Sequence, residues 1–147
     1  FAMSEPSGES RADSPDAAMT ERFDRWLQAF GSAWQNQNAE EMAALFAGDG
    51  GFFETPFGPP CRGRSEILAH WQEALGRQDN VVFMYRTMAV RDDLGVARWA
   101  AQFDLTEAGL RLEFDGVIEC RLAADDPARL VRPWWHDREA PRRKQPA

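Results

Sequence analysis

The chain has 147 residues, a length typical of a single domain, and its 44% hydrophobic and 28% charged residues are ordinary for a globular protein. A net charge of −7 argues against binding to nucleic acid or to an anionic membrane, because both need a basic surface. No apolar run is long enough to span a bilayer and no signal peptide is recognisable, so we expect a cytoplasmic protein.

The two ends of the chain differ in composition from the part between them. Residues 1–13 contain no hydrophobic anchor and are predicted to be disordered, with the residues before Met3 left over from cloning. Residues 138–147 are rich in proline and basic side chains and are predicted to be a disordered basic tail. One domain is therefore expected over residues 14–137. Lys144 is the only lysine among 17 basic residues, which is typical of a GC-rich bacterial genome.

A long first helix is predicted to begin at Ser14-Pro15-Asp16, which combines a hydroxyl cap, proline at the first helical position and an acidic residue in the first turn. Hydrophobic residues then follow at helical spacing on one face. They are Met19, Phe23, Trp26, Leu27, Phe30 and Trp34. We expect this face to pack on a core.

Two shorter helices are predicted next. Asn38 followed by Glu41 resembles a capping box, and the short helix that it opens is predicted to carry Phe46 and to end at the glycine-rich residues 48–51. The third helix is predicted over residues 64–75, with His70 on its flank. Its inward face is predicted to consist of Ile67, Leu68, Trp71 and Leu75.

The pattern changes to strands after residue 80. Strands are predicted at 81–90, 97–105, 110–122 and 130–136, separated by turn-rich segments. In the second of these, hydrophobic and polar residues alternate with a period of two. Gly116 interrupts the third and suggests a bulge. Helices followed by a meander of strands predict an α+β fold in which three N-terminal helices pack on a curved, mostly antiparallel sheet.

Three segments resemble a known family: Trp34-x-x-Gln37-Asn38-Ala39-Glu40, Phe53-Glu54-Thr55-Pro56-Phe57-Gly58 and Arg132-Pro133-Trp134-Trp135-His136. They are similar to the nuclear transport factor 2-like superfamily, and most of all to its SnoaL-like domains, over about residues 19–137. The resemblance implies a cone-shaped α+β barrel that admits a small hydrophobic molecule at its open end. It also implies a homodimer that pairs through its outer sheet faces. The fold hosts isomerases, dehydratases, cyclases, epoxide hydrolases and binders without activity, so function does not follow from it.

The catalytic sets of two enzyme groups in this superfamily do not match the sequence. Ketosteroid isomerases need a tyrosine, a carboxylate base and a protonated acid, and the resemblance aligns these three with Phe30, Thr55 and Ile118. Enzymes similar to limonene epoxide hydrolase need Arg-x-Asp on the strand that here reads 98–104, and it is absent. Neither reaction is predicted.

Two polar residues remain as catalytic candidates. Glu54 follows two phenylalanines, and burial among aromatic rings would raise the pKa of its carboxyl and favour a role as a base. Alternatively, the carboxylate points outward or pairs with Arg62 or Arg64. His136 ends the last strand and could donate a proton into the cavity, or it hydrogen-bonds at the strand end. Asp115 is expected to face solvent or to pair with an arginine.

Aromatic residues are the strongest remaining signal for a ligand site. The resemblance turns a set of them inward, where they would line an apolar pocket or belong to the core. The set is Phe30, Trp34, Tyr85, Trp99, Phe103, Phe114, Ile118 and Trp135. The leading hypothesis is a binder of a small hydrophobic or aromatic molecule, without a cofactor or metal. A lyase or isomerase that uses Glu54 with His136 or Tyr85 on a carbonyl substrate, and a protein-interaction module, remain alternatives.

Overall fold

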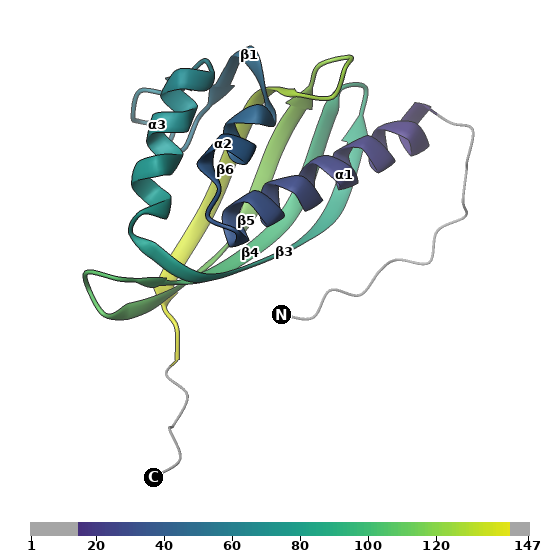
Figure 1. Cartoon of the computed structure of the whole chain (residues 1–147). Coiled ribbons are helices and arrows are strands. Elements are labelled where there is room, and N and C mark those ends of the chain that lie inside the picture. Colours follow the sequence, from purple (N-terminus) through teal and green to yellow (C-terminus); the bar gives the residue numbers. More distant parts are fainter. Residues whose placement is uncertain (1–14, 142–147) are drawn as a thin grey trace.

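The computed structural model describes residues 15–141 and shows three helices on one face of a six-stranded sheet (Figure 1). The helices are α1 (Pro15–Gln35), α2 (Ala39–Ala44) and α3 (Arg64–Leu75). The strands are β1 (Phe46–Phe52), β2 (Cys61–Arg62), β3 (Gln78–Arg91), β4 (Leu94–Leu105), β5 (Leu110–Leu122) and β6 (Ala128–Glu139). The predicted α+β class and the number of helices are confirmed.

The strands form one open sheet in the order β2-β1-β6-β5-β4-β3. Strands β3 to β6 are an antiparallel meander, whereas β1 pairs with β6 in parallel. The sheet curves around α1, which crosses its concave face (Figure 1). The predicted cone is therefore a curved sheet covered by helices and not a closed barrel.

Helix α1 packs the face that its sequence periodicity predicts. All six hydrophobic residues of that face are buried: Met19, Phe23, Trp26, Leu27, Phe30 and Trp34. Gly31 lies on the same face, and a Cβ atom there would come within 2.6 Å of Cδ1 of Phe83 on β3. The glycine lets α1 approach the sheet closely, so that the concave face and the helix enclose a common core.

The segment after α2 differs from the prediction. The helix ends at Ala44 and Phe46 begins β1, so residues 48–51 lie within a strand. The pairing of β1 with β6 shifts register between Phe46 and Gly51. The glycine-rich residues thus form an irregularity within a strand and do not end a helix. The prediction was wrong because glycine is compatible both with a strand bulge and with the end of a helix.

The end of the domain also differs. Strand β6 runs to Glu139 and Ala140 is buried, so the domain extends past the predicted boundary at residue 137. The register of β5 with β6 holds this strand in place as far as the pair of Leu112 with Glu139. The predicted disordered residues 1–13, and residues 142–147 of the predicted tail, lie outside the described residues.

Gly116 does not form the predicted bulge. Strand β5 pairs with β4 and β6 without a register shift at this residue. A Cβ atom at Gly116 would lie 1.7 Å from the carbonyl oxygen of Trp134 on β6, so no side chain fits there. The glycine is required by the close approach of two strands.

No helix within 15–141 has the length and apolar character needed to cross a membrane.

Cys61 and Cys120 are free thiols. Burial raises the pKa of the Cys120 thiol, so this side chain packs as a small hydrophobic residue.

Candidate functional site

A cavity of about 70 Å³ lies between the helices and the concave face of the sheet. A single water needs roughly 10–15 Å³, so this space fits a few waters or one compact organic molecule. The wall is mostly aromatic and comes from α1, α3, Phe52 at the end of β1, the nearby Glu54, and six residues of strands β3 to β6. It consists of Phe30, Trp34, Phe52, Glu54, His70, Trp71, Ala74, Gln78, Trp99, Phe114, Ile118, Pro133 and Trp135.

The sheet contributes aromatic rings to this wall because of its strand register. Trp99, Gly116 and Trp135 are direct neighbours across β4, β5 and β6, so they share the concave face. The indoles of Trp99 and Trp135 meet across Gly116, with ring centroids 6.3 Å apart. Phe114 stacks on Trp135 with centroids 5.5 Å apart. The concave face of β4, β5 and β6 is therefore aromatic where it meets the cavity.

Glu54 and His70 are the two ionisable residues of the cavity wall, which also contains the amide of Gln78. The carboxylate Oε2 of Glu54, which follows β1, lies 2.8 Å from Nε2 of His70 on α3. The imidazole also packs against Phe52, with ring centroids 5.5 Å apart. Both side chains keep partial contact with solvent, since 27% of the His70 side chain and 42% of the Glu54 side chain are exposed. The pair therefore joins the cavity to the surface.

The contact between these residues changes the acidity of the imidazole. The hydrogen bond to the Glu54 carboxylate raises the pKa of His70 above its ordinary value, burial opposes the change, and the charges of Glu54 and Glu73 add to it. His70 consequently holds its proton at a higher pH than an isolated histidine. A protonated imidazole beside a carboxylate can supply a proton to a bound molecule, and the neutral form can accept one.

His70 lines the cavity, whereas the sequence pattern predicted that it lies on the flank of the helix. A signal was present: Ile67, His70, Trp71 and Ala74 follow the i, i+3, i+4, i+7 spacing of one helix face. In the structure the last three of these line the cavity and Ile67 is fully buried. The inward face of α3 is wider than the hydrophobic residues alone suggest.

Most of the predicted ligand-binding residues line the cavity, namely Phe30, Trp34, Trp99, Phe114, Ile118 and Trp135. Phe103 is not part of this wall but lines an adjoining open depression that also includes Glu54 and His70. Tyr85 is not part of either. Its hydroxyl donates a hydrogen bond to Oδ1 of Asp24 on α1, 2.6 Å away, and burial together with this bond raises the pKa of the phenol.

His136 does not reach the cavity. Neighbouring residues of a strand point to opposite faces, and Trp135 lines the cavity, so His136 is exposed on the outer face of the sheet. The structure therefore replaces the expected pairing of Glu54 with His136 or Tyr85 by the contact between Glu54 and His70.

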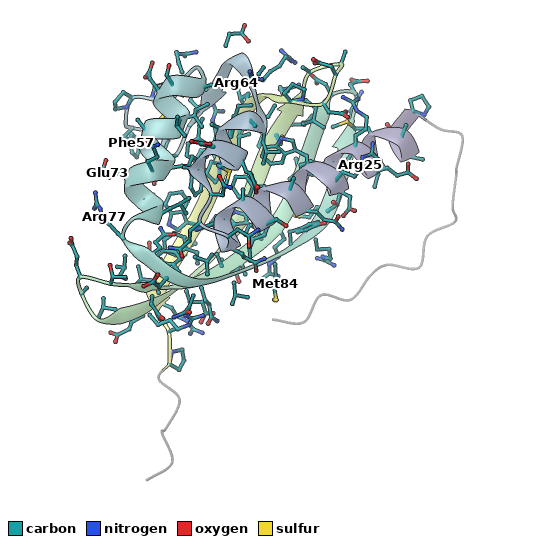
Figure 2. The ribbon with its side chains drawn as sticks, in the orientation of Figure 1. Arg25, Phe57, Arg64, Glu73, Arg77 and Met84 are labelled. Atoms are coloured by element: carbon teal, nitrogen blue, oxygen red, sulfur yellow. The ribbon has the colours of Figure 1, made fainter. Side chains whose placement is uncertain are left out.

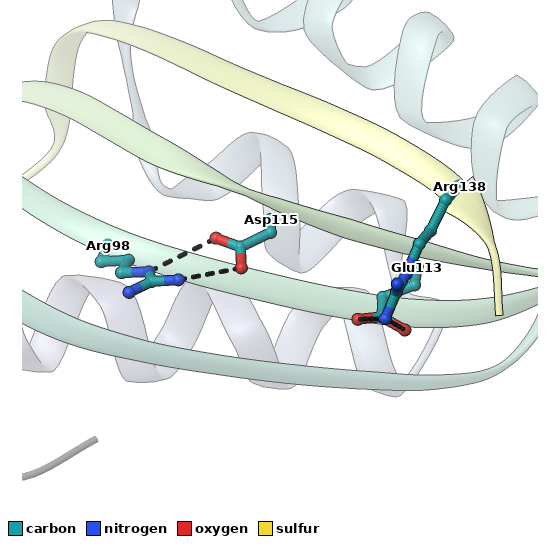
Figure 3. A network of polar contacts seen from close by, with 4 residues as sticks. All are labelled: Arg98, Glu113, Asp115 and Arg138. Atoms are coloured by element: carbon teal, nitrogen blue, oxygen red, sulfur yellow. Dashed lines mark hydrogen bonds and ion pairs between the residues drawn. The ribbon is translucent and has the colours of Figure 1, made fainter. Parts of the chain in front are cut away.

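Asp115 and Arg132 form ion pairs on the sheet. Asp115 pairs with Arg98, with Oδ2 3.0 Å from Nη2, which agrees with the expected pairing of Asp115 with an arginine (Figure 3). Arg132 lies 3.5 Å from a carboxylate oxygen of Glu119 and stacks over the ring of Phe53, 4.8 Å from its centroid. Residues 15–141 bring together no group of three or more His, Cys, Asp or Glu that could hold a metal ion.

The model of the SnoaL-like domain family matches residues 24–132, which include every strand up to the middle of β6 and most of the cavity wall. The chain belongs to this family. The predicted resemblance is confirmed, and so is its implication for the fold. Among curated proteins, none is similar enough in sequence to count as a match.

Solved structures with the same fold are distant from this SnoaL-like domain in sequence. A hypothetical protein from Catenulispora acidiphila with a ketosteroid isomerase-like fold, described in complex with trimethylamine, is 16% identical, with a TM-score of 0.67 and 74% of this chain and 83% of that chain covered. RV0760c from Mycobacterium tuberculosis is 15% identical, with a TM-score of 0.72 and coverages of 81% and 96%. The epoxide hydrolase/cyclase-like enzyme SalBIII, described in pyran ring formation in polyether salinomycin, is 12% identical, with a TM-score of 0.67 and coverages of 81% and 91%.

This SnoaL-like domain lacks the polar groups that the isomerases of the fold place in the cavity. Phe30 and Ile118, which align with the isomerase tyrosine and protonated acid, both line the cavity wall. Thr55, which aligns with the isomerase base, is exposed. Among the residues that line this cavity, only Glu54 and His70 have side chains suited to acid–base chemistry.

Proposed function

We propose that this SnoaL-like domain binds a small, mainly apolar molecule in the cavity between its helices and its sheet. The observation that carries the proposal is the composition of the wall, in which four indole rings and three phenyl rings surround one carboxylate–imidazole pair. Small-molecule sites typically combine an apolar wall with a few polar groups that orient the ligand. The complex of the Catenulispora acidiphila protein with trimethylamine supports a ligand of compact size.

Filling the cavity with a side chain tests the proposal. Ala74 on α3 lines the cavity, whereas Ala69 on the same helix is exposed. We expect isothermal titration calorimetry to show benzene binding to the wild type and to Ala69→Leu, and none to Ala74→Leu. Binding of equal strength to Ala74→Leu, or none to the wild type, would contradict the proposal. Thermal unfolding of both variants establishes that each is folded.

A second candidate is acid–base catalysis as a lyase or isomerase on a carbonyl compound, favoured by the 2.8 Å contact between Glu54 and His70. The base removes a proton from the carbon next to the carbonyl, and the same pair returns a proton at another position or to a leaving hydroxyl group. SalBIII, an epoxide hydrolase/cyclase-like enzyme of the same fold, supports a catalytic use of such a cavity.

Exchange of α-hydrogens for deuterium tests the catalytic candidate without a known substrate. Cyclopentanone in D₂O is followed by proton NMR, with and without the protein. We expect the wild type to accelerate exchange and Glu54→Gln and His70→Gln to slow it roughly 10²-fold or more, since a positioned acid or base contributes about 10²–10⁴. His136→Gln is the matched control, because His136 lies on the outer face. No acceleration by the wild type would remove this candidate and leave binding untouched.

A further inference from the structure

Two indole N–H groups in the cavity wall have no hydrogen-bond partner. Nε1 of Trp71 on α3 and Nε1 of Trp99 on β4 are buried atoms without an acceptor in the described part of the chain. Their residues are only 5% and 4% exposed. Buried indole N–H groups normally find a partner, and a missing one needs an explanation.

Three other indoles of this domain do have partners. Nε1 of Trp34 donates to Oε1 of Gln78 at 2.7 Å, and Nε1 of Trp26 donates to the carbonyl oxygen of Leu45 at 2.9 Å. Nε1 of Trp135 lies 3.3 Å from Oδ2 of Asp137. Trp34 and Trp135 also line the cavity, so two of the four indoles in its wall have a partner within the described chain and those of Trp71 and Trp99 do not.

The surroundings of the two donors are aromatic rings. Trp71 packs against Phe30, Phe52, Trp34 and the imidazole of His70, and Trp99 packs against Phe83, Phe114, Trp135 and Trp34. Both indoles contact Trp34, with ring centroids at 5.5 and 6.0 Å, so the two rings lie in the same part of the cavity wall. Of the polar side chains in the wall, Gln78 already accepts from Trp34, and Glu54 is bound to His70.

We propose that the ligand of this cavity carries a neutral oxygen acceptor, and that the indole N–H groups of Trp71 and Trp99 donate to it. The inference rests on the proposed function and narrows its ligand class to compact apolar molecules with one carbonyl, ether or hydroxyl oxygen. A neutral acceptor is required because an anion would lose its hydration beside the Glu54 carboxylate. Such an acceptor satisfies donors that no group within residues 15–141 reaches, so the two N–H groups distinguish ligands of equal shape by whether they carry an acceptor.

A pair of probes that differ only in the acceptor tests this inference. Cyclopentanone and methylenecyclopentane have nearly the same shape, and only the ketone has an oxygen. We expect the wild type to bind cyclopentanone at least 10-fold more tightly. Trp71→Phe and Trp99→Phe keep an aromatic ring and remove the N–H, and each should lower this preference at least threefold while affinity for methylenecyclopentane persists. Trp134→Phe, on the outer face, is the matched control and should keep the full preference.

A measurement on the unmodified chain does not depend on the folding of variants. In ¹H–¹⁵N spectra of the wild type, the assigned indole signals of Trp71 and Trp99 should move downfield with cyclopentanone and not with methylenecyclopentane. Equal binding of both probes, with no difference at these two signals, would overturn the inference while the proposed binding function stands. If neither probe binds, the proposed function fails together with the inference.

Discussion

The imidazole Nε2 of His70 lies 2.8 Å from Oε2 of Glu54, and this contact joins the middle of α3 to the segment that follows β1. Exposed ion pairs contribute little to folding, and both of these side chains are partly exposed. The contact is therefore better explained by its effect on the imidazole in the cavity wall than by a contribution to the stability of the fold. It fixes the orientation of the only imidazole in the cavity wall of the described chain and supplies the hydrogen bond and negative charge that raise the pKa of this imidazole.

The first prediction concerns the titration of His70. Its pKa in the folded protein is raised above the unfolded value of about 6.5 by the hydrogen bond to Glu54. The resulting stabilisation is fully present below the unfolded pKa and is lost as the pH rises through the folded pKa. Urea unfolding should thus show a stability that falls as the pH is raised from 6 toward the folded pKa, and NMR titration of the imidazole should give that pKa directly.

The variant Glu54→Gln separates this effect from other pH-dependent groups. Without the carboxylate, the pKa of His70 should fall and the loss of stability over this pH range should shrink. His136, the only other histidine, provides an internal signal in the same spectra because it lies on the outer face. An unchanged His70 titration in Glu54→Gln would show that the contact does not exist in solution.

A second prediction concerns Gly116. A Cβ atom there would lie 1.7 Å from the carbonyl oxygen of Trp134, so Gly116→Ala must push β5 and β6 apart or bend the backbone. Overpacking of this kind lowers the free energy of unfolding by about 1–3 kcal/mol or more. We expect the upper end of this range, because β5 is hydrogen-bonded to a strand on each side and cannot move away easily. Gly48→Ala is the control, since nothing lies within 4 Å of a Cβ atom at that position. Chemical denaturation of both variants measures the difference, and similar stabilities would contradict the close approach of the strands.

A third prediction compares two phenylalanines. Phe23 on α1 is completely buried, whereas Phe57, in the segment between β1 and β2 beside α3, is 99% exposed (Figure 2). Phe23→Ala should lower the free energy of unfolding by about 3–5 kcal/mol, because it removes a buried ring and leaves a void. Phe57→Ala should leave the free energy of unfolding unchanged in the same denaturation experiment. A small effect at Phe23 would mean that α1 packs on the sheet less tightly than described.

Local patterns were enough to predict the main elements of this fold. The 3.6-residue spacing predicted the buried face of α1, and the predicted bounds 64–75 of the third helix agree with α3. Residues 48–51 were harder, because glycine is equally compatible with a helix end and with a strand bulge. The parallel pairing of β1 with β6 selects the strand bulge over the helix end. A local pattern cannot predict this pairing, because it joins residues that are far apart in the sequence.

In the candidate site, too, local patterns predicted some features, whereas others depend on contacts between distant parts of the chain. Aromatic residues on strands could be assigned to the cavity because alternation places Trp99, Phe114 and Trp135 on one face. The same alternation excludes His136 once Trp135 is inside, so assigning both to the cavity was inconsistent. The partner of Glu54 could not be predicted, since it depends on how α3 lies against the end of β1. The two unsatisfied indole donors are likewise visible only when every neighbour of each ring is known.

The last prediction concerns the outer face of the sheet, which we propose binds a second copy of the chain, as the resemblance leads us to expect. Trp134 on β6 and Met84 and Met88 on β3 are large hydrophobic residues that remain exposed on this sheet, and Met84 points away from the helices (Figure 2). The same sheet also carries ion pairs, such as that of Arg98 with Asp115 (Figure 3). A face with apolar residues and charges of both signs can match a copy of itself in a two-fold dimer.

Light scattering coupled to gel filtration tests this assembly. We expect twice the chain mass of 16.6 kDa for the wild type and the single chain mass for Trp134→Asp, because a carboxylate buried in an apolar interface has no partner. Phe57→Asp introduces the same charge at an exposed residue away from the sheet and should remain dimeric. A wild type that is monomeric at micromolar concentration would contradict the proposal and would leave the exposed indole of Trp134 available to a different protein, the role of an interaction module.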